Sequence, residues 1–324
     1  MSDGTDAQTL SPDDAFAALG NETRMDILRT LAEADAPLSF SELRERVGVS
    51  DSGRFNYHLD TVEGHFVRKT DGEYELRQAG RRVIGAVLSG AITDDPVVEP
   101  TEIDDPCPVC GAPTLVAFFE GRVEHYCTEC AGYYGRDLPS SESATAGDAS
   151  SGTPEYGYLG SFQLPPAGTE GRAPGELFRA ASTWGLLNLI AVGAGVCPEC
   201  SAPLASSPRI CEGHDSTDDH CEQCNNRHAI QLRFECTNCL YGGEAAFGVA
   251  LMADVHVLAF LATHGINPVS PSDPATYSAA LMNYEEELLS ADPFEARFTL
   301  ALEDGAAVTV TVDDDLNVVE VGHP

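Results

Sequence analysis

Ten of the eleven cysteines in this 324-residue chain fall into five Cys-x-x-Cys pairs. A tight turn of this spacing points two sulfur atoms at one ion, and two such turns complete a tetrahedral site. The odd total, together with an N-terminus that lacks a signal-peptide pattern, argues against a disulfide framework. We therefore expect the chain to fold around metal ions bound by these turns, which we call knuckles.

The first two pairs predict a zinc ribbon over residues 107–137. Its predicted ligands are Cys107, Cys110, Cys127 and Cys130. Strands over residues 114–119 and 122–126, with a turn at Glu120-Gly121, would join the two knuckles. Redox-active or merely reduced cysteines are the weaker reading, since a redox pair needs no second pair at this distance. His125 alternates along its strand, and we expect it at the surface and not on the metal.

The second module, residues 197–239, offers seven cysteines where two closed four-ligand sites need eight ligands. His214 stands three residues after Cys211, the spacing of a knuckle partner, and is predicted to supply the eighth ligand. His220 directly precedes a ligand, where its ring would point away. The predicted ligands of this module are Cys197, Cys200, Cys211, His214, Cys221, Cys224, Cys236 and Cys239. With the first site they make twelve ligands for three zinc ions and leave no thiol over.

The pairing of knuckles in the second module follows from its last strand. Ile230, Leu232 and Phe234 share one face of a strand that runs directly into the Cys236/Cys239 knuckle, as the strand before Cys127 does. This knuckle would then close a second ribbon that begins at Cys197/Cys200, with residues 211–224 inserted at the hairpin tip as a third site. Interleaved pairings remain an alternative.

Four protein ligands close each site and leave no position for water, so we expect the zinc ions to be structural and not catalytic. The sequence contains no G-x-S-x-G, G-x-x-x-x-G-K-[ST] or H-E-x-x-H motif. We therefore expect that the protein is not an enzyme.

The rest of the chain reads as an α+β multidomain protein, because 324 residues exceed the size of one hydrophobic core. Residues 91–106 are rich in acids and prolines, and 138–155 are of low complexity, so both are predicted linkers, the second disordered. Segments at 174–193 and 244–264 predict helices that pack in a core rather than line a ligand pocket. The longest apolar stretches of these regions, "WGLLNLIAVGAGV" and "AAFGVALMADVHVLAFLA", fall short of the roughly 20 residues that span a bilayer. The alternating short apolar runs of the C-terminal tail predict an antiparallel meander.

The sequence therefore predicts five successive segments. They are a domain over 12–92, the acidic linker 93–106, the ribbon 107–137, the linker 138–155, and a helical and Cys/His domain with the C-terminal sheet over 156–324.

Residues 12–92 predict four helices, a hairpin and a last helix. Ser11 and Asn21 are predicted helix caps, and Asp71-Gly72 is a strong hairpin signal. The fourth helix, which we expect Ser50 to open, is the one of interest. Its apolar residues Phe55, Leu59 and Val62 would face the core, with His58 as a structural neighbour. Its outward-facing residues would be Ser52, Arg54, Asn56 and Tyr57.

The stretch "ALGNETRMDILRTLAEADAPLSFSELRERVGVSDSGRFNYHLDTVEGHFVRKTDGEYELRQAG" resembles ArsR-type winged helix-turn-helix transcription regulators, over roughly residues 12–92. The resemblance implies a homodimer whose recognition helix enters the major groove of double-stranded DNA, while Arg68 and Lys69 on the hairpin, or wing, contact the backbone. The cysteine pair with which the founding arsenic sensors bind metal is absent, since no cysteine precedes Cys107. Induction by a metal is therefore not implied.

Chemistry supports this expectation independently, because arginine can pair with guanine and asparagine with adenine, while serine and tyrosine reach bases or phosphates. We expect a sequence-specific DNA-binding regulator with structural zinc sites. The alternative is an adaptor whose ribbons bind the transcription machinery or another protein, without sequence-specific DNA binding.

The net charge of −34 opposes DNA binding at first sight. However, residues 20–90 hold ten basic and 12 acidic residues, a net charge of −2, so the other 253 residues carry −32. An acidic chain whose only lysine is Lys69 resembles haloarchaeal cytosolic proteins, which implies a cytoplasmic location and molar internal salt. Counterion release contributes little affinity in molar salt, so a basic surface is not required there.

Overall fold

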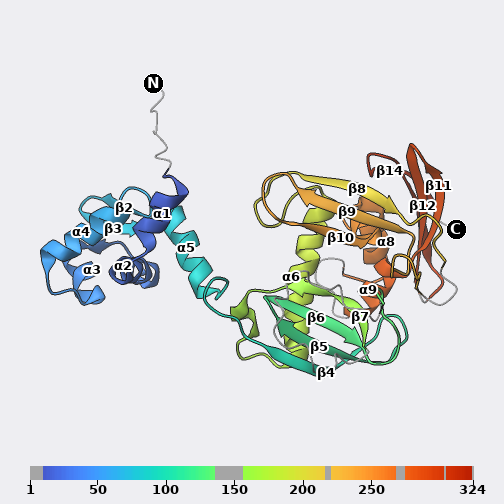
Figure 1. Ribbon diagram of the computed structural model, residues 1–324, viewed down its shortest axis with the longest axis horizontal. Coiled ribbons are helices and arrows are strands. Elements are labelled where there is room, and N and C mark those ends of the chain that lie inside the picture. The colour runs from blue at the N-terminus through green and yellow to red at the C-terminus, as the bar shows by residue number, and fades with distance from the viewer. Residues whose placement is uncertain (1–9, 136–155, 216–219, 268–273, 303, 323–324) are drawn as a thin grey trace. The chain divides into compact units, whose positions relative to one another are not determined.

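The computed structural model describes residues 10–135, 156–215, 220–267, 274–302 and 304–322. The chain divides into two compact units, residues 1–94 and 95–324 (Figure 1). The first has a hydrophobic core of its own, and so does the second. In the part of the chain that the structure describes, four antiparallel sheets combine with helices, which makes the fold α+β.

The N-terminal unit is mostly helical. Its elements are α1 (Pro12–Leu19), α2 (Glu22–Glu33), β1 (Leu38–Ser39), α3 (Phe40–Val47), α4 (Ser52–Val62), β2 (Val67–Thr70), β3 (Glu73–Leu76) and α5 (Gln78–Leu88). The strands form a sheet of order β1-β3-β2. The predicted caps are confirmed: the backbone N–H of Asp14 donates to Ser11 Oγ at 3.1 Å, and that of Arg24 to Asn21 Oδ1 at 3.4 Å.

Helix α4 is anchored by the three residues predicted to face the core. Phe55, Leu59 and Val62 are fully buried, against α2 residues such as Leu28. The start of the helix was predicted wrongly, because Asp51 and not Ser50 caps it. The Asp51 carboxylate accepts from the backbone N–H groups of Gly53 and Arg54, and a negative cap is favoured at the positive end of a helix.

The hairpin between β2 and β3 turns at the predicted pair. Asp71 and Gly72 have φ values of 54° and 89°, as a two-residue turn with left-handed backbone requires. Glycine adopts this backbone at low cost, and aspartate tolerates it better than most residues.

In the C-terminal unit, the first sheet has the order β4-β5-β6-β7. Its strands are β4 (Val98–Pro106), β5 (Pro113–Phe119), β6 (Arg122–Cys127) and β7 (Gly157–Gln163). The predicted linker is therefore wrong over residues 98–106, which pair with β5; the prolines there are tolerated because β4 is an edge strand.

Strand β7 joins regions predicted to be separate. It pairs with β6, from Arg122 opposite Gln163 to Cys127 opposite Gly157. The long helix α6 (Pro174–Gly193), which begins and ends as predicted, packs on all four strands (Figure 1). The first ribbon thus belongs to the same unit as the second Cys/His module. The predicted disorder of 138–155 lies outside the described residues.

The second sheet, order β10-β9-β8, contains β8 (Leu204–Ile210), β9 (Ile230–Cys236) and β10 (Gly242–Ala246). The single helix predicted over 244–264 is wrong. That run forms the end of β10, then α7 (Gly248–Leu251) and α8 (Val255–Thr263). Asp254 interrupts it, since its carboxylate caps α8 by accepting from the backbone N–H groups of His256 and Val257.

The predicted C-terminal meander is confirmed. After α9 (Pro274–Met282), the strands β11 (Glu285–Ala291), β12 (Phe294–Ala301), β13 (Ala307–Val312) and β14 (Val318–Gly322) pair in sequence order. Its inner face joins α7, α8 and α9 in one core, where the rings of Phe247 and Phe298 stack at 4.4 Å. Among the described residues, no helix is long and apolar enough to cross a membrane.

Candidate functional site

Three clusters of metal-ligating side chains are the clearest candidate sites in the described residues. Their members are Cys107, Cys110, Cys127 and Cys130; Cys197, Cys200, Cys236 and Cys239; and Cys211, His214, Cys221 and Cys224. In each cluster the four ligand atoms lie within 4.8 Å of one another. The predicted grouping of all twelve residues is confirmed, including the insertion of the third cluster between β8 and β9.

The spacing of the sulfur atoms fits a tetrahedral ion. Cys110 and Cys127 lie 3.5 Å apart, Cys107 and Cys130 3.7 Å, and Cys200 and Cys236 3.5 Å, measured between Sγ atoms. Metal–sulfur bonds of about 2.3 Å at tetrahedral angles place two sulfurs about 3.8 Å apart, whereas a disulfide needs about 2.05 Å. All eleven cysteines are free thiols.

The knuckle backbone stabilises the thiolate form that binds metals. Backbone N–H groups of Cys239 and Asn238 donate to Cys236 Sγ at 3.3 Å each. The bond from Cys239 is the main cause that lowers the pKa of the Cys236 thiol to about 6. Equivalent N–H donors approach Cys127 Sγ from Glu129 and Cys130. These bonds favour ligation because the thiolate is the ligand.

The third cluster holds its histidine in one orientation. His214 Nδ1 lies 3.6 Å from Cys224 Sγ, and its Nε2 donates to the carbonyl oxygen of Arg227 at 3.2 Å. A ligating histidine commonly donates its second N–H to such an acceptor, which fixes the ring and its tautomer. His220 is not a member of the cluster, as predicted.

His125 is the one predicted position of this region that the structure overturns. It is no member of a cluster, yet it is buried and not at the surface. Its ring packs 4.3 Å from that of Phe178 on α6, and burial lowers the pKa of the imidazole to about 3. Strand alternation was right, but the outer face of β6 is covered by α6, a contact that the local sequence does not reveal.

The four outward-facing residues predicted on α4 are all exposed. Ser52, Arg54, Asn56 and Tyr57 lie opposite the buried face of the helix, and the Tyr57 side chain is 67% exposed. Asn56 Nδ2 donates to Asp60 Oδ2 at 2.7 Å. The ring of His58 is buried, as its predicted structural role requires, and burial is the main cause that lowers its pKa.

The two cationic residues predicted on the hairpin are also exposed, and each has a neighbour. Arg68 Nε donates to Glu75 Oε1 across the β2–β3 pair at 2.9 Å, which raises the pKa of Arg68. Lys69 Nζ lies 5.0 Å from the centre of the Tyr74 ring, within range of a cation–π contact. An incoming phosphate would have to compete with Glu75 for Arg68.

Residues 104–318 match the model of a family described as domain of unknown function DUF7351, over more than half of the chain. The chain belongs to the DUF7351 family. Residues 12–87 match a second such model, domain of unknown function DUF7347, which covers α1 to α5 except for the last residue of α5. No curated protein and no solved structure matches the chain.

The DUF7351 region contains two copies of one ribbon. "CPVCGAP" and "CTEC" recur as "CPECSAP" and "CTNC". The hydroxyls of Thr128 and Thr237 donate to the carbonyl oxygens of Pro113 and Pro203 at 2.9 and 3.0 Å. In each copy a third strand follows the second knuckle, so β5-β6-β7 matches β8-β9-β10 in order.

The sequence analysis did not identify three positions beside the ligands at which the backbone is left-handed. Gly111, Ser201 and Asn225 each follow the second cysteine of a knuckle and have φ values of 76°, 61° and 54°. The left-handed backbone reverses the chain after the knuckle. The Gly in "CPVCG" indicates such a backbone, whereas the Ser and the Asn do not.

Two asparagines connect the clusters of the DUF7351 region to its other elements. Asn283, just after α9, donates to the carbonyl oxygen of Pro108 in the first knuckle at 3.2 Å, and its own side-chain oxygen accepts from Arg227. Asn225 Nδ2, in the third cluster, donates to the carbonyl oxygen of Tyr134 at 3.2 Å. These hydrogen bonds link the cysteine clusters to α9 and to the segment after the first ribbon.

Proposed function

We propose that the protein is a sequence-specific DNA-binding transcription regulator, in which residues 12–92 form a winged helix-turn-helix and α4 is its recognition helix. The proposal rests on one observation: α4 is locked to the core by Phe55, Leu59 and Val62, while its other face exposes side chains able to read base edges. A helix fixed on one side and polar on the other suits the major groove.

Each exposed residue has a role in this proposal. Arg54 pairs with guanine and Asn56 with adenine, and Asp60 holds the Asn56 amide in place before DNA binds. Ser52 and Tyr57 contact bases or phosphates. Arg68 and Lys69 on the β2–β3 hairpin, the proposed wing, contact the phosphate backbone.

The proposed role of the metal sites is structural, with zinc as the ion. Cysteine and histidine ligands in groups of four are the donor set that zinc prefers, and four protein ligands leave no open position for chemistry. Zinc would stabilise the DUF7351 region, while DNA is read by the other unit.

Exposed apolar side chains support a homodimer. Phe16 on α1, Leu88 at the end of α5 and Ile92 just beyond it are 75%, 68% and 74% exposed. Large apolar residues at such exposure favour burial against another chain, and a dimer would present two recognition helices to a palindromic site.

The second candidate is an adaptor that binds another protein of the transcription machinery. One observation favours it: Leu240, directly after a metal knuckle, is fully exposed, and Trp184 and Leu187 on α6 are also exposed. Selection from randomised double-stranded DNA with the full-length protein separates the two functions. An enriched palindrome supports the regulator, and failure to enrich any sequence at molar KCl supports the adaptor.

Substitutions on α4 and on the hairpin should affect DNA binding differently. Asn56→Ala and Arg54→Ala should each weaken binding to the selected site by roughly 1–3 kcal/mol and relax the preference at one position of each half-site. Arg68→Ala should weaken binding to every sequence alike, because a phosphate contact carries no sequence information. Titrations of the selected site and of single-base variants measure both effects.

Arg29→Ala is the matched control for these variants. Arg29 is an exposed arginine of α2 that pairs with Asp26, and its loss should leave DNA binding unchanged. An equal loss on all sequences for the two α4 variants would mean that the helix does not read bases.

A further inference from the structure

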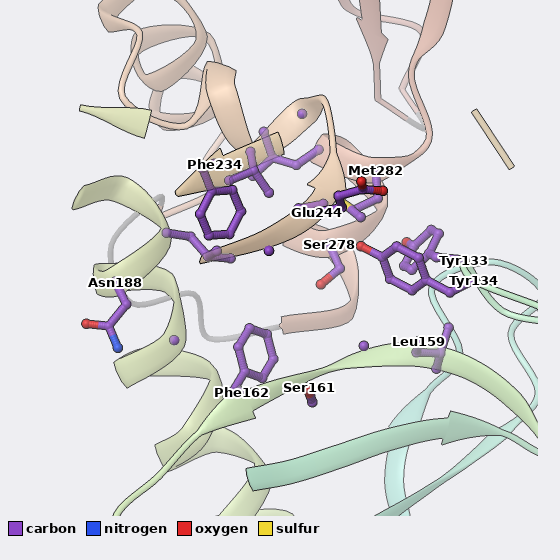
Figure 2. Close-up of a pocket in the computed structure, with 18 of the residues that line it drawn as sticks. Tyr133, Tyr134, Leu159, Ser161, Phe162, Asn188, Phe234, Glu244, Ser278 and Met282 are labelled. Carbon is purple, nitrogen blue, oxygen red and sulfur yellow. The ribbon is translucent and has the colours of Figure 1, made fainter. Parts of the chain in front are cut away.

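A cavity of about 660 Å³ lies between the two ribbon sheets of the C-terminal unit. Strand β7 forms one wall and strand β10 the other, and α6 and α9 contribute the rest of the lining (Figure 2). In Figure 2, Tyr133 and Tyr134 lie at one end and Asn188 of α6 at the other, with Phe162 on the β7 side and Phe234 opposite. Its volume falls within the range of small-molecule sites, about 300–1,000 Å³.

The repeat explains why space remains there. Strands β7 and β10 are the third strands of the two ribbons, and they face each other across the cavity. Both contribute glycines to the lining, Gly160 from β7 and Gly242 and Gly243 from β10. Residues without side chains on facing walls leave room that packing would otherwise fill. The Gly242–Glu244 stretch is exposed, so the cavity opens to solvent along β10.

The lining is aromatic and nearly uncharged. Among the residues that the structure describes, five tyrosines and two phenylalanines line it, and Glu244 is the only acidic one, in a chain with 52 acids. Both charged residues of the lining already have partners. Glu244 accepts from Arg209 Nη1 at 2.7 Å, and Arg122 Nε donates to Ser161 Oγ at 3.0 Å. The described lining therefore offers no unpaired charge to a ligand, which disfavours a charged one.

Two of the lining tyrosines offer no polar group to a ligand. Tyr133 and Tyr277 are only 5% and 1% exposed, and both line the cavity. Their hydroxyl oxygens are themselves buried, so they do not reach the cavity space.

We propose that this cavity binds a neutral, ring-containing small molecule, held mainly by apolar contacts with the lining. The aromatic side chains supply flat apolar contacts for the rings of the ligand. The site is separate from the DNA-binding face and does not depend on the proposed regulator function.

The test uses the neutral fluorophore 6-propionyl-2-(dimethylamino)naphthalene, which has two fused rings and one ketone, with the full-length, metal-loaded protein. We expect saturable binding of one probe per chain with a blue-shifted emission. The only tryptophan, Trp184, adjoins the cavity residue Gly185 on α6, so bound probe should quench its fluorescence by energy transfer. A Trp184→Phe variant should bind the probe without this transfer.

Cavity-filling substitutions should displace the probe. Ser278→Phe, on α9, and Gly243→Ile, on β10, should each weaken probe binding at least tenfold, whereas the matched control Ser278→Ala should not. Circular dichroism and metal content verify that each variant is folded.

An anionic probe checks the chemical class, since 2-(p-toluidino)naphthalene-6-sulfonate has similar rings but a sulfonate. We expect it to bind at least tenfold more weakly than the ketone. The proposal would be overturned by the absence of saturable binding, or by unchanged affinity in a folded cavity-filling variant. If both filling variants fail to fold, the absence of energy transfer from Trp184 to the bound probe overturns it.

Discussion

Metal analysis of the purified full-length protein should give three zinc ions per chain, one for each cluster, and chelation should unfold residues 95–324 while residues 10–94 stay folded. Structural zinc sites contribute roughly 10–16 kcal/mol each to folding, comparable with the total stability of about 5–15 kcal/mol for a typical domain. Loss of even one ion should therefore lower the folding stability of the whole unit that contains it.

The N-terminal unit should be spared for two reasons. No cysteine precedes Cys107, so this unit contains no cluster. Its core, built on Ile27, Leu28, Leu43 and Phe55, is continuous without residues from the other unit. Hydrogen exchange followed by mass spectrometry during chelation distinguishes the two responses, because exchange should accelerate only in peptides after residue 95.

A histidine pair in one loop tests the ligand assignment. His214→Ala should lose one of the three zinc ions, because it removes the fourth ligand of the third cluster. His220→Ala, next to the ligand Cys221 but outside the cluster, should keep all three. Two or fewer ions in the wild type at full occupancy would contradict the three-site count. Three ions in His214→Ala would show that another group is the ligand.

The metal clusters could be predicted from the sequence because their geometry is local. A Cys-x-x-Cys turn fixes its two sulfurs within four residues, and the strand ending at Cys236 identifies the partner of the Cys197/Cys200 knuckle. The same holds for caps and turns such as Ser11 and Asp71-Gly72. Each depends on hydrogen bonds or backbone angles within a few residues.

Features that depend on distant contacts were missed. β4 was read as a linker, because nothing in its acidic, proline-containing sequence reveals that Ile103 packs under α6 beside Phe118. β7 lies after a stretch of low complexity, and its pairing with β6 makes one sheet of two predicted domains. The buried His125 follows from the same packing.

The cavity, too, depends on contacts between distant parts of the chain. Its walls come from two distant parts of the sequence, β7 with α6 and β10 with α9, and its lining includes glycines such as Gly160 and Gly243. Apolar helices at 174–193 and 244–264 were expected only to pack together. α6 does pack on the first sheet, but Asn188 and Leu189 on the same helix also line the cavity.

Specific DNA binding by the full-length protein should persist, or strengthen, as KCl rises from tenths of molar to several molar. The charge of −32 outside residues 20–90 should repel DNA at low salt. Screening shortens the range of this repulsion from about 10 Å at 0.1 M to about 3 Å at 1 M. A basic regulator that neutralises six to ten phosphates behaves oppositely and loses roughly 10³–10⁵ in affinity between 50 and 200 mM salt.

A fragment of residues 1–94 isolates the effect of the acidic remainder, because this unit has its own core. At about 0.2 M KCl the fragment should bind the selected site roughly an order of magnitude more tightly than the full chain, since like charge slows association. At several molar KCl this advantage should disappear, because repulsion is screened while base contacts such as those proposed for Arg54 and Asn56 are short-ranged and remain. Titrations of both proteins over the salt range, with circular dichroism as the check on folding, measure the two slopes. A steep loss of affinity by folded full-length protein, or identical slopes for fragment and full chain, would mean that the acidic region does not control DNA binding.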